Sequence, residues 1–231
     1  MKFLSGLLAG NAEKFPDRIA AIHGETTMTY GKLNHEADRL ANSLRRTGLK
    51  KSGRAALLMK GGIDWLLAFY ACQKLGVGLA LIHLRLMPEE MLRMVALTGA
   101  DTLICSTEYL PQAEYMAERS GRDFRIIVQG GNENAPDGAC SFEDLLRGED
   151  CSDAQEVMTG DEESIILFTS GTTSAAKGVV RTQRMMAAYA SVLAGEEPMN
   201  AGDTMLTPAP LYHATGICCV VKMLVGAGTL I

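Results

Sequence analysis

An apolar segment at residues 165–168 runs directly into a loop rich in hydroxyl side chains, and this loop holds the residues best suited to chemistry. It contains five Ser or Thr residues, two glycines and one lysine, and no carboxylate. Hydroxyls and the backbone N–H groups of a tight glycine-containing turn can point together at an anion, and a lysine ammonium supplies compensating charge. The pattern predicts a phosphate-binding loop. Its candidate ligands are Thr169, Ser170, Gly171, Thr172, Thr173, Ser174 and Lys177.

The spacing of this loop does not fit the nucleotide P-loop. That motif needs G-x-x-x-x-G-K followed by Ser or Thr and then a helix. Here Ala176 takes the place of the second glycine, and Gly178 takes the place of the hydroxyl residue that would hold magnesium. Val179 and Val180 predict a second strand instead of a helix. A P-loop NTPase is therefore not expected, whereas a plain Ser/Thr-rich hairpin loop with an exposed lysine stays open at this point.

The loop resembles the phosphate-binding signature of the adenylate-forming superfamily, which comprises acyl-CoA synthetases, aryl-CoA ligases, luciferases and the adenylation domains of peptide synthetases. The usual form is TSGTTG-x-PKGV, and the chain departs from it at Ser174 and Ala176. Serine resists positive φ and alanine does not fix φ, so both changes affect the conformation of the loop.

The resemblance extends along the whole chain. Residues 15–20 and 29–33 are similar to the family's "P-d-x-i-A" and "T-Y-x-E-L" segments, and residues 68–78 and 88–90 also match. Two segments depart from the pattern. Leu81, Ile82 and His83 replace a triplet that usually contains proline, and residues 53–56 lack the usual aspartate.

A second candidate site lies at residues 210–216, which resemble the family's "P-l-f-H-x-x-G" segment. In relatives this segment lines the pocket for the carboxylate substrate, so the resemblance implies substrate-binding roles for Tyr212, His213, Thr215 and Gly216. His213 would orient an acyl or aryl carboxylate near the α-phosphate. The alternative is a histidine at a helix start that the backbone satisfies. The other three histidines, His23, His35 and His83, have no partner at readable spacing and are interpreted as structural or surface residues.

The implied function is that of an acid–CoA ligase. A carboxylate attacks the α-phosphate of ATP to give an acyl-adenylate and pyrophosphate, and a thiol such as CoA then takes the acyl group. Lys177 and Thr172 are the predicted catalytic residues, acting as electrostatic clamps on the phosphates. The implied ligands are ATP, CoA and a carboxylic acid, with magnesium bound outside this chain and no metal ligand within it.

The chain has no counterpart of the family's "Y-G-x-T-E" segment, which contributes adenine contacts and a metal-binding glutamate. We therefore expect the N-terminal portion of a longer enzyme, inactive alone and completed by a C-terminal part or a complementary chain. The alternatives are a catalytically incomplete nucleotide-binding or interaction module, and one half of a split enzyme.

The elements that must position these residues alternate between short apolar strands and helices. This alternation predicts an α/β fold with doubly wound, mainly parallel sheets flanked by helices. Ligands in such folds bind at the carboxyl ends of the strands. An acidic, weakly periodic stretch separates a first unit at 1–150 from a phosphate-loop and pocket unit at 151–231. The segments predicted as strands are 19–22, 55–59, 79–82, 102–105 and 124–128, and those predicted as helices are 29–44, 63–75, 89–97, 113–119 and 142–146.

Composition agrees with a globular protein of 231 residues, 47% of them hydrophobic, with a net charge of −5. The basic cluster formed by Arg45, Arg46, Lys50, Lys51 and Arg54 lacks interleaved aromatic residues, so no nucleic-acid partner is expected. We interpret the cluster as solvated surface, with a phosphate-bearing partner such as CoA as the alternative. The six cysteines show no metal or disulfide spacing, which favours free thiols and a cytoplasmic location. No segment has the ~18 uninterrupted apolar residues of a membrane span.

Overall fold

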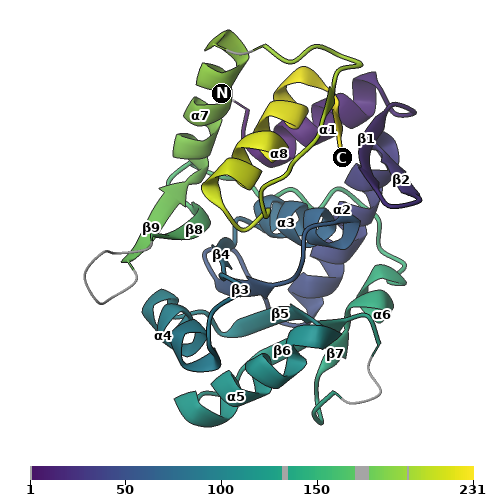
Figure 1. Ribbon diagram of the computed structural model, residues 1–231. Helices are drawn as coiled ribbons and strands as arrows, with labels where there is room; N and C mark the ends of the chain where they lie inside the picture. Colours follow the sequence, from purple (N-terminus) through teal and green to yellow (C-terminus); the bar gives the residue numbers. More distant parts are fainter. Residues whose placement is uncertain (1, 132–134, 170–176, 197) are drawn as a thin grey trace.

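The computed structural model describes residues 2–131, 135–169, 177–196 and 198–231, which fold into two β-sheets covered by helices (Figure 1). The alternation of strands and helices predicted for the first half is confirmed. The helices are α1 (Leu4–Lys14), α2 (Tyr30–Arg46), α3 (Ile63–Leu75), α4 (Pro88–Thr98), α5 (Leu110–Ser120), α6 (Phe142–Leu146), α7 (Gln183–Glu196) and α8 (Ala214–Gly226). The strands are β1 (Ile19–His23), β2 (Thr26–Thr29), β3 (Arg54–Leu58), β4 (Gly78–Leu81), β5 (Thr102–Ser106), β6 (Arg125–Gln129), β7 (Cys140–Ser141), β8 (Glu163–Thr169), β9 (Lys177–Thr182), β10 (Thr204–Met205) and β11 (Thr229–Leu230).

The larger sheet has seven strands in the order β7-β6-β5-β3-β4-β8-β9. All neighbouring pairs are parallel except β8 and β9, which form an antiparallel hairpin at one edge. The order moves outward in both directions from β3, which is the doubly wound arrangement predicted from the sequence. Because the strands run in parallel, the loops that follow them gather at one edge of the sheet, here called the carboxyl edge.

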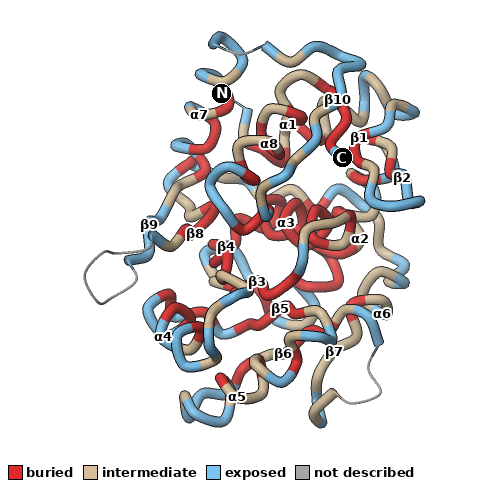
Figure 2. The backbone as a smooth tube through the Cα atoms, viewed as in Figure 1, coloured by how far each residue is buried: buried red, intermediate tan, exposed pale blue. Residues whose placement is uncertain are grey.

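Each face of this sheet packs against its own set of helices. Ala55 and Leu57 of β3 join a core with α2, α3 and α8, whereas Ala56 and Leu58 join a second core with α4 and α5. This division follows from the alternation of side chains along a strand, which sends neighbouring residues to opposite faces. Figure 2 shows the resulting band of buried residues running through the strands and the helices on either side.

The smaller sheet joins the two ends of the chain in the order β10-β11-β1-β2. Ala21 in β1 is opposite Leu230 in β11. The Tyr30 hydroxyl donates to the carbonyl oxygen of Gly228 at 2.7 Å and lies 3.0 Å from that of Met223. Helix α3 contacts both β1 and β4 and is buried along nearly its whole length. An apolar helix of this kind needs cover on all sides, which the two sheets and α2 provide.

The acidic segment at 148–163 folds back over the basic cluster near the amino ends of the strands. Glu163 accepts two hydrogen bonds from Arg54, and Lys51 lies 2.8 Å from Glu162. Arg45 donates to Glu156 at 3.0 Å. The surface predicted to be solvated is therefore partly covered by the chain's own carboxylates.

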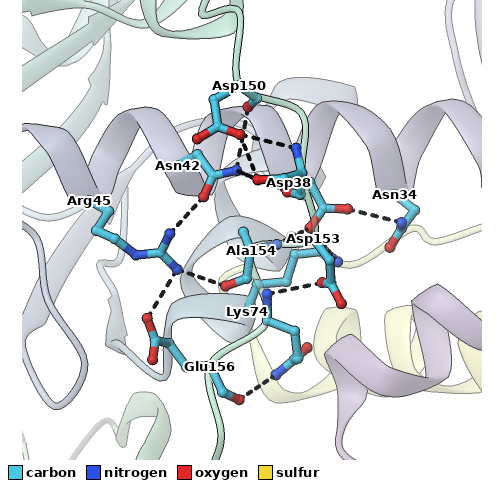
Figure 3. Close-up of polar contacts among 11 residues, drawn as sticks. Asn34, Asp38, Asn42, Arg45, Lys74, Asp150, Asp153, Ala154 and Glu156 are labelled. Atoms are coloured by element: carbon cyan, nitrogen blue, oxygen red, sulfur yellow. Dashed lines mark hydrogen bonds and ion pairs between the residues drawn. The ribbon is translucent and has the colours of Figure 1, made fainter.

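A buried ion pair lies beneath this segment (Figure 3). Lys74 is fully buried, and its Nζ is 2.9 Å from Oδ1 of Asp38. The same carboxylate accepts hydrogen bonds from the side-chain amide of Asn34 and the backbone N–H of Ala154. The backbone N–H of Glu156 donates to the carbonyl oxygen of Lys74, so the segment is tied to both partners of the pair.

Candidate active site

The predicted phosphate loop follows β8 at the carboxyl edge of the larger sheet and precedes β9. Thr169 is the last residue of β8 and Lys177 the first of β9, and the two are opposite each other in the hairpin register. Both are exposed. The second strand predicted after Lys177 is confirmed, and it replaces the helix that a P-loop NTPase would have there.

The remaining loop residues lie outside the described part of the chain. They are residues 170–176, and they include the candidate ligands Ser170, Gly171, Thr172, Thr173 and Ser174. Their roles therefore stay predictions, whereas the hairpin that presents them is established by Thr169 and Lys177. An exposed ammonium at the mouth of such a hairpin fits a phosphate group, because Lys binds phosphate as a mobile point charge.

The predicted substrate segment leads into α8, which begins directly after His213. Tyr212 is buried, whereas His213 and Thr215 are exposed. The His213 backbone N–H donates to the carbonyl of Pro210 at 2.9 Å, but its side chain makes no capping hydrogen bond. The imidazole therefore does not cap the start of α8, which is the role that the alternative interpretation gives it.

Gly216 allows this segment to pack closely on itself. A Cβ at Gly216 would lie against the carbonyl oxygen of Pro210 and 2.7 Å from the Cα of Leu211. A distance below 3.0 Å leaves no room for a side chain without a shift of the backbone. Gly216 therefore fixes the path of the chain on which Tyr212 and His213 are carried.

The structure brings a third ring to this pair, that of His83, for which the sequence spacing indicated no partner. His83 follows β4 at the carboxyl edge, and its ring centroid is 5.0 Å from those of Tyr212 and His213, with tilts of 62° and 74°. Edge-to-face contacts of this kind are favourable for aromatic rings. The pKa of His83 is lowered by burial first, and then by the nearby charges of His213 and Arg85. A lowered pKa keeps the His83 imidazole neutral at pH 7.

A pocket of 390 Å³ lies between the carboxyl ends of β3, β5 and β6, and none of the three rings lines it. It is lined in part by His23, Lys60, Asp64 and Gln129, so His23 also has a place that the sequence did not indicate. Burial raises the pKa of Asp64, although a hydrogen bond from Gln129 at 2.9 Å acts in the opposite direction. A smaller pocket of 220 Å³ shares His23 and continues towards Leu211.

Within the described ranges, no three His, Cys, Asp or Glu residues form a group that could hold a metal ion, and no helix is long and apolar enough to cross a membrane. All six cysteines are free thiols.

The described residues thus form a doubly wound sheet with a hairpin at its carboxyl edge that carries Thr169 and Lys177. Comparison with known sequences gives the family. Residues 8–231 match the AMP-binding enzyme family, and the chain belongs to it.

The sequence is 29% identical over its full length to a long-chain-fatty-acid–CoA ligase of Mycobacterium tuberculosis, of which it covers 45%. It is 28% identical, over 97% of its length, to the 2-succinylbenzoate–CoA ligase of Bacillus licheniformis, of which it covers 43%. The chain thus spans less than half the length of these curated relatives. Among solved structures, the N-terminal domain of FACL13 from Mycobacterium tuberculosis matches with a TM-score of 0.87 and 25% identity, over 100% of this chain and 57% of that one.

Proposed function

We propose that this chain is the N-terminal part of an ATP-dependent acid–CoA ligase. The observation that carries the proposal is the position of two groups at one edge of one sheet. The predicted phosphate hairpin begins at Thr169, at the end of β8, and the ring cluster includes His83, which follows the neighbouring strand β4. Membership in the AMP-binding enzyme family supplies the chemistry that such a pair of sites would perform.

In the proposed reaction, a carboxylate oxygen attacks the α-phosphorus of ATP while the bond to pyrophosphate breaks. The sulfur of a thiol such as CoA then attacks the acyl carbon, and AMP leaves. The residues of this chain would act by position and charge. Lys177 and Thr172 would stabilise the negative charge that develops on the leaving pyrophosphate, with Thr169, Ser170, Gly171, Thr173 and Ser174 completing the loop. Tyr212, His213, Thr215 and Gly216 would form the pocket that holds the acid.

The proposal assigns ATP, a carboxylic acid and CoA as ligands. ATP would be used with magnesium, and the metal ligand is proposed to lie in a further part of the enzyme. We also propose a cytoplasmic location, supported by the six free thiols, which suit a reducing compartment. The domain division at residue 150 remains a prediction. Strands from both predicted units pair directly, since β8 joins β4 and β11 joins β1.

The test is ATP–pyrophosphate exchange across a panel of fatty, aryl and amino acids. It is run on this chain alone, and on the chain joined to any downstream part of its gene product or to a complementary chain. Acid-dependent exchange only in the joined form supports the proposal and identifies the acid class. Binding of ATP without exchange in every form would instead favour the alternative, a catalytically incomplete nucleotide-binding module.

A further inference from the structure

The two strands of the predicted phosphate hairpin, β8 and β9, are held at their base by a buried side-chain amide. The base lies near the amino ends of the sheet strands, where Glu163 of β8 is opposite Thr182 of β9. The residue that follows each of these, Ser164 in β8 and Gln183 at the start of α7, is fully buried. Buried polar side chains need hydrogen-bond partners, and both find one in the same residue, Gln73 of α3.

The amide of Gln73 joins both ends of the hairpin base. Its Oε1 accepts a hydrogen bond from the Ser164 hydroxyl and another, at 3.1 Å, from Nε2 of Gln183. Its Nε2 donates to the carbonyl oxygen of Ser164 at 3.2 Å. Gln73 is itself fully buried, in the last turn of a helix that is buried along nearly its whole length. Hydrogen bonds in such a low-dielectric interior are strong, so the base is fastened to a rigid element of the core.

The base is also the point where the hairpin departs from regular pairing. Between Glu163 and Ile165, β8 advances by two residues while β9 advances by one, which makes Ser164 the extra residue of a β-bulge. A bulge bends its strand and increases the local twist, and so it changes the direction of the chain that follows. Gln73 therefore holds the residue that sets the direction of the rest of the hairpin.

The open end of the hairpin has fewer supports than the base. Strand β9 is the edge strand and pairs only with β8 among the described strands, and its residues 177–180 are exposed. Lys177 precedes Gln183 by six residues, which is about 20 Å along an extended strand. Over that length, a rotation of about 3° at the base moves Lys177 by about 1 Å, and a misplacement of about 1 Å can cost about 100-fold in rate.

We propose that Gln73 is a positioning residue for the predicted phosphate hairpin, and that the hydrogen bonds of its amide set the angle at which Lys177 meets a polyphosphate. The inference rests on the proposed function, because it takes the β- and γ-phosphates of ATP as the ligand of the hairpin. Gln73 acts through β8 and β9 and does not touch the ligand, since it binds the base of the hairpin and Lys177 stands at the other end.

The experiment compares Gln73→Met, which keeps the volume of the side chain and removes its hydrogen bonds, with Asn42→Leu as the matched control. Asn42 is also a buried amide on a helix, but it donates to the carbonyl oxygen of Ser152 at 2.9 Å and accepts from Arg45 at 2.7 Å, away from the hairpin. Both substitutions are made in the whole enzyme that carries this chain, alone and combined with Lys177→Ala. Pyrophosphate exchange gives the kinetic constants for ATP and for the acid, and calorimetry gives the Kd of inorganic tripolyphosphate.

We expect Gln73→Met to lower kcat/KM for ATP and to raise the Kd of tripolyphosphate, each about tenfold, because β8 still pairs with β4 and limits the tilt. KM for the acid should stay unchanged, and Asn42→Leu should match the unmodified enzyme in all three quantities. In the Lys177→Ala background, Gln73→Met should change them less than about twofold, since substitutions that act through the same group are not additive. Ser164→Ala, which removes one of the hydrogen bonds to Gln73, should have the same effects at smaller size.

Several outcomes would overturn the inference. One is equal kinetics and equal Kd in Gln73→Met and Asn42→Leu. Another is an effect of Gln73→Met that is as large in the Lys177→Ala background as without it, and a third is a parallel rise of KM for ATP and for the acid. If Gln73→Met does not fold, unchanged constants in Ser164→Ala would overturn the inference instead.

The two measurements also separate this inference from the proposed function. An unmodified enzyme that binds tripolyphosphate but shows no exchange with any acid would overturn the proposed function, and the Kd values of the variants would then decide the inference alone. Absence of both tripolyphosphate binding and exchange in the unmodified enzyme would overturn both.

Discussion

The two edges of the seven-stranded sheet are built from different kinds of contact. At the amino edge, charged side chains pair with one another. Arg54 forms an ion pair with Glu163, and Lys51 forms one with Glu162. The fully buried Lys74 forms an ion pair with Asp38. At the carboxyl edge, an ion pair joins Lys60 and Glu108 after β3 and β5. Beyond β4 and β8, however, His83 contacts other rings, and Thr169 and Lys177 are exposed.

The amino edge therefore contributes mainly to stability, whereas the carboxyl edge carries the groups proposed to bind ligands. Paired charges at the amino edge fasten the acidic segment to the sheet, which keeps those carboxylates away from the phosphate hairpin. A polyphosphate would be repelled by carboxylates near its site, so their position at the opposite edge favours anion binding at the carboxyl edge. The net charge of the chain, −5, hides this arrangement.

The largest loss of stability is expected when the buried ion pair at the amino edge is disrupted. Asp38→Ala would leave the Lys74 ammonium buried without its counter-charge and the Ala154 N–H without its acceptor. Removal of one partner of a buried pair costs about 3–5 kcal/mol. We expect the free energy of unfolding, measured by urea titration, to fall by that amount.

Asp144→Ala is the matched control, because Asp144 pairs with Arg147 and both side chains are largely exposed, at 68% and 76%. An exposed pair contributes at most about 1 kcal/mol. Replacing both buried partners, with Asp38→Leu and Lys74→Met, should recover much of the loss, since no unpaired charge then remains. A loss in Asp38→Ala no larger than in Asp144→Ala would contradict the role of the pair.

At the carboxyl edge, the largest effect is expected on rate instead of stability. Lys177→Ala in the whole enzyme should slow acid-dependent pyrophosphate exchange about 100-fold, which corresponds to about 2.7 kcal/mol in the barrier. The unfolding free energy should change little, because Lys177 is exposed. Lys50→Ala is the control, since Lys50 is an exposed lysine next to the amino edge. Equal exchange rates in the two variants would refute the assignment of Lys177.

Gly216 is a position where close packing and the proposed acid pocket depend on each other, because it packs against the segment that carries Tyr212 and His213. Gly216→Ala would push a methyl group against Pro210 and Leu211, and overpacking of this kind costs about 2 kcal/mol. We expect lower stability in urea titrations and a raised KM for the acid, since Tyr212 and His213 lie on the displaced segment. Gly195→Ala, in α7, is the control, because a Cβ there meets nothing within 4 Å. Identical effects of the two substitutions would show that the close approach at Gly216 does not matter.

The local part of the fold could be predicted from the sequence because its signals are local. Helix α3 begins at Ile63 and ends at Leu75 as predicted, and Gly76 follows in the left-handed conformation that ends helices. The side chain of Thr29 caps α2 by accepting from the N–H of Lys32, as its position before the helix indicated. Helix α6 has the predicted bounds as well.

What could not be predicted depends on contacts between distant segments. The pairing of β1 with β11 and the meeting of His83 with His213 join residues far apart in the chain, and no spacing in the sequence records such contacts. Short strands such as β7 and β10 have too few residues to show a period. Ligands in such folds bind at the carboxyl ends of strands. That rule could have indicated His83 and Lys60 as candidate site residues, because each follows a predicted apolar strand.

The smallest expected effect tests how the amino edge depends on pH. Burial raises the pKa of Glu162, but hydrogen bonds from Lys51 and from the backbone N–H groups of Thr159 and Gly160 outweigh it and lower the pKa from 4.5 to about 2. The ionised carboxylate therefore stabilises the folded state fully above pH 4.5, and this contribution is lost as the pH falls towards 2.

Glu162→Gln should cost about 1 kcal/mol at neutral pH and flatten the decline of stability between pH 4.5 and 2. Asp161→Asn, at an exposed ion pair with Arg184, should leave both the stability and the slope unchanged. If Glu162→Gln keeps the slope of the unmodified protein, carboxylates other than Glu162 control the acid sensitivity of the amino edge, and the acidic segment is held there mainly by its buried contacts with Asp38 and Lys74.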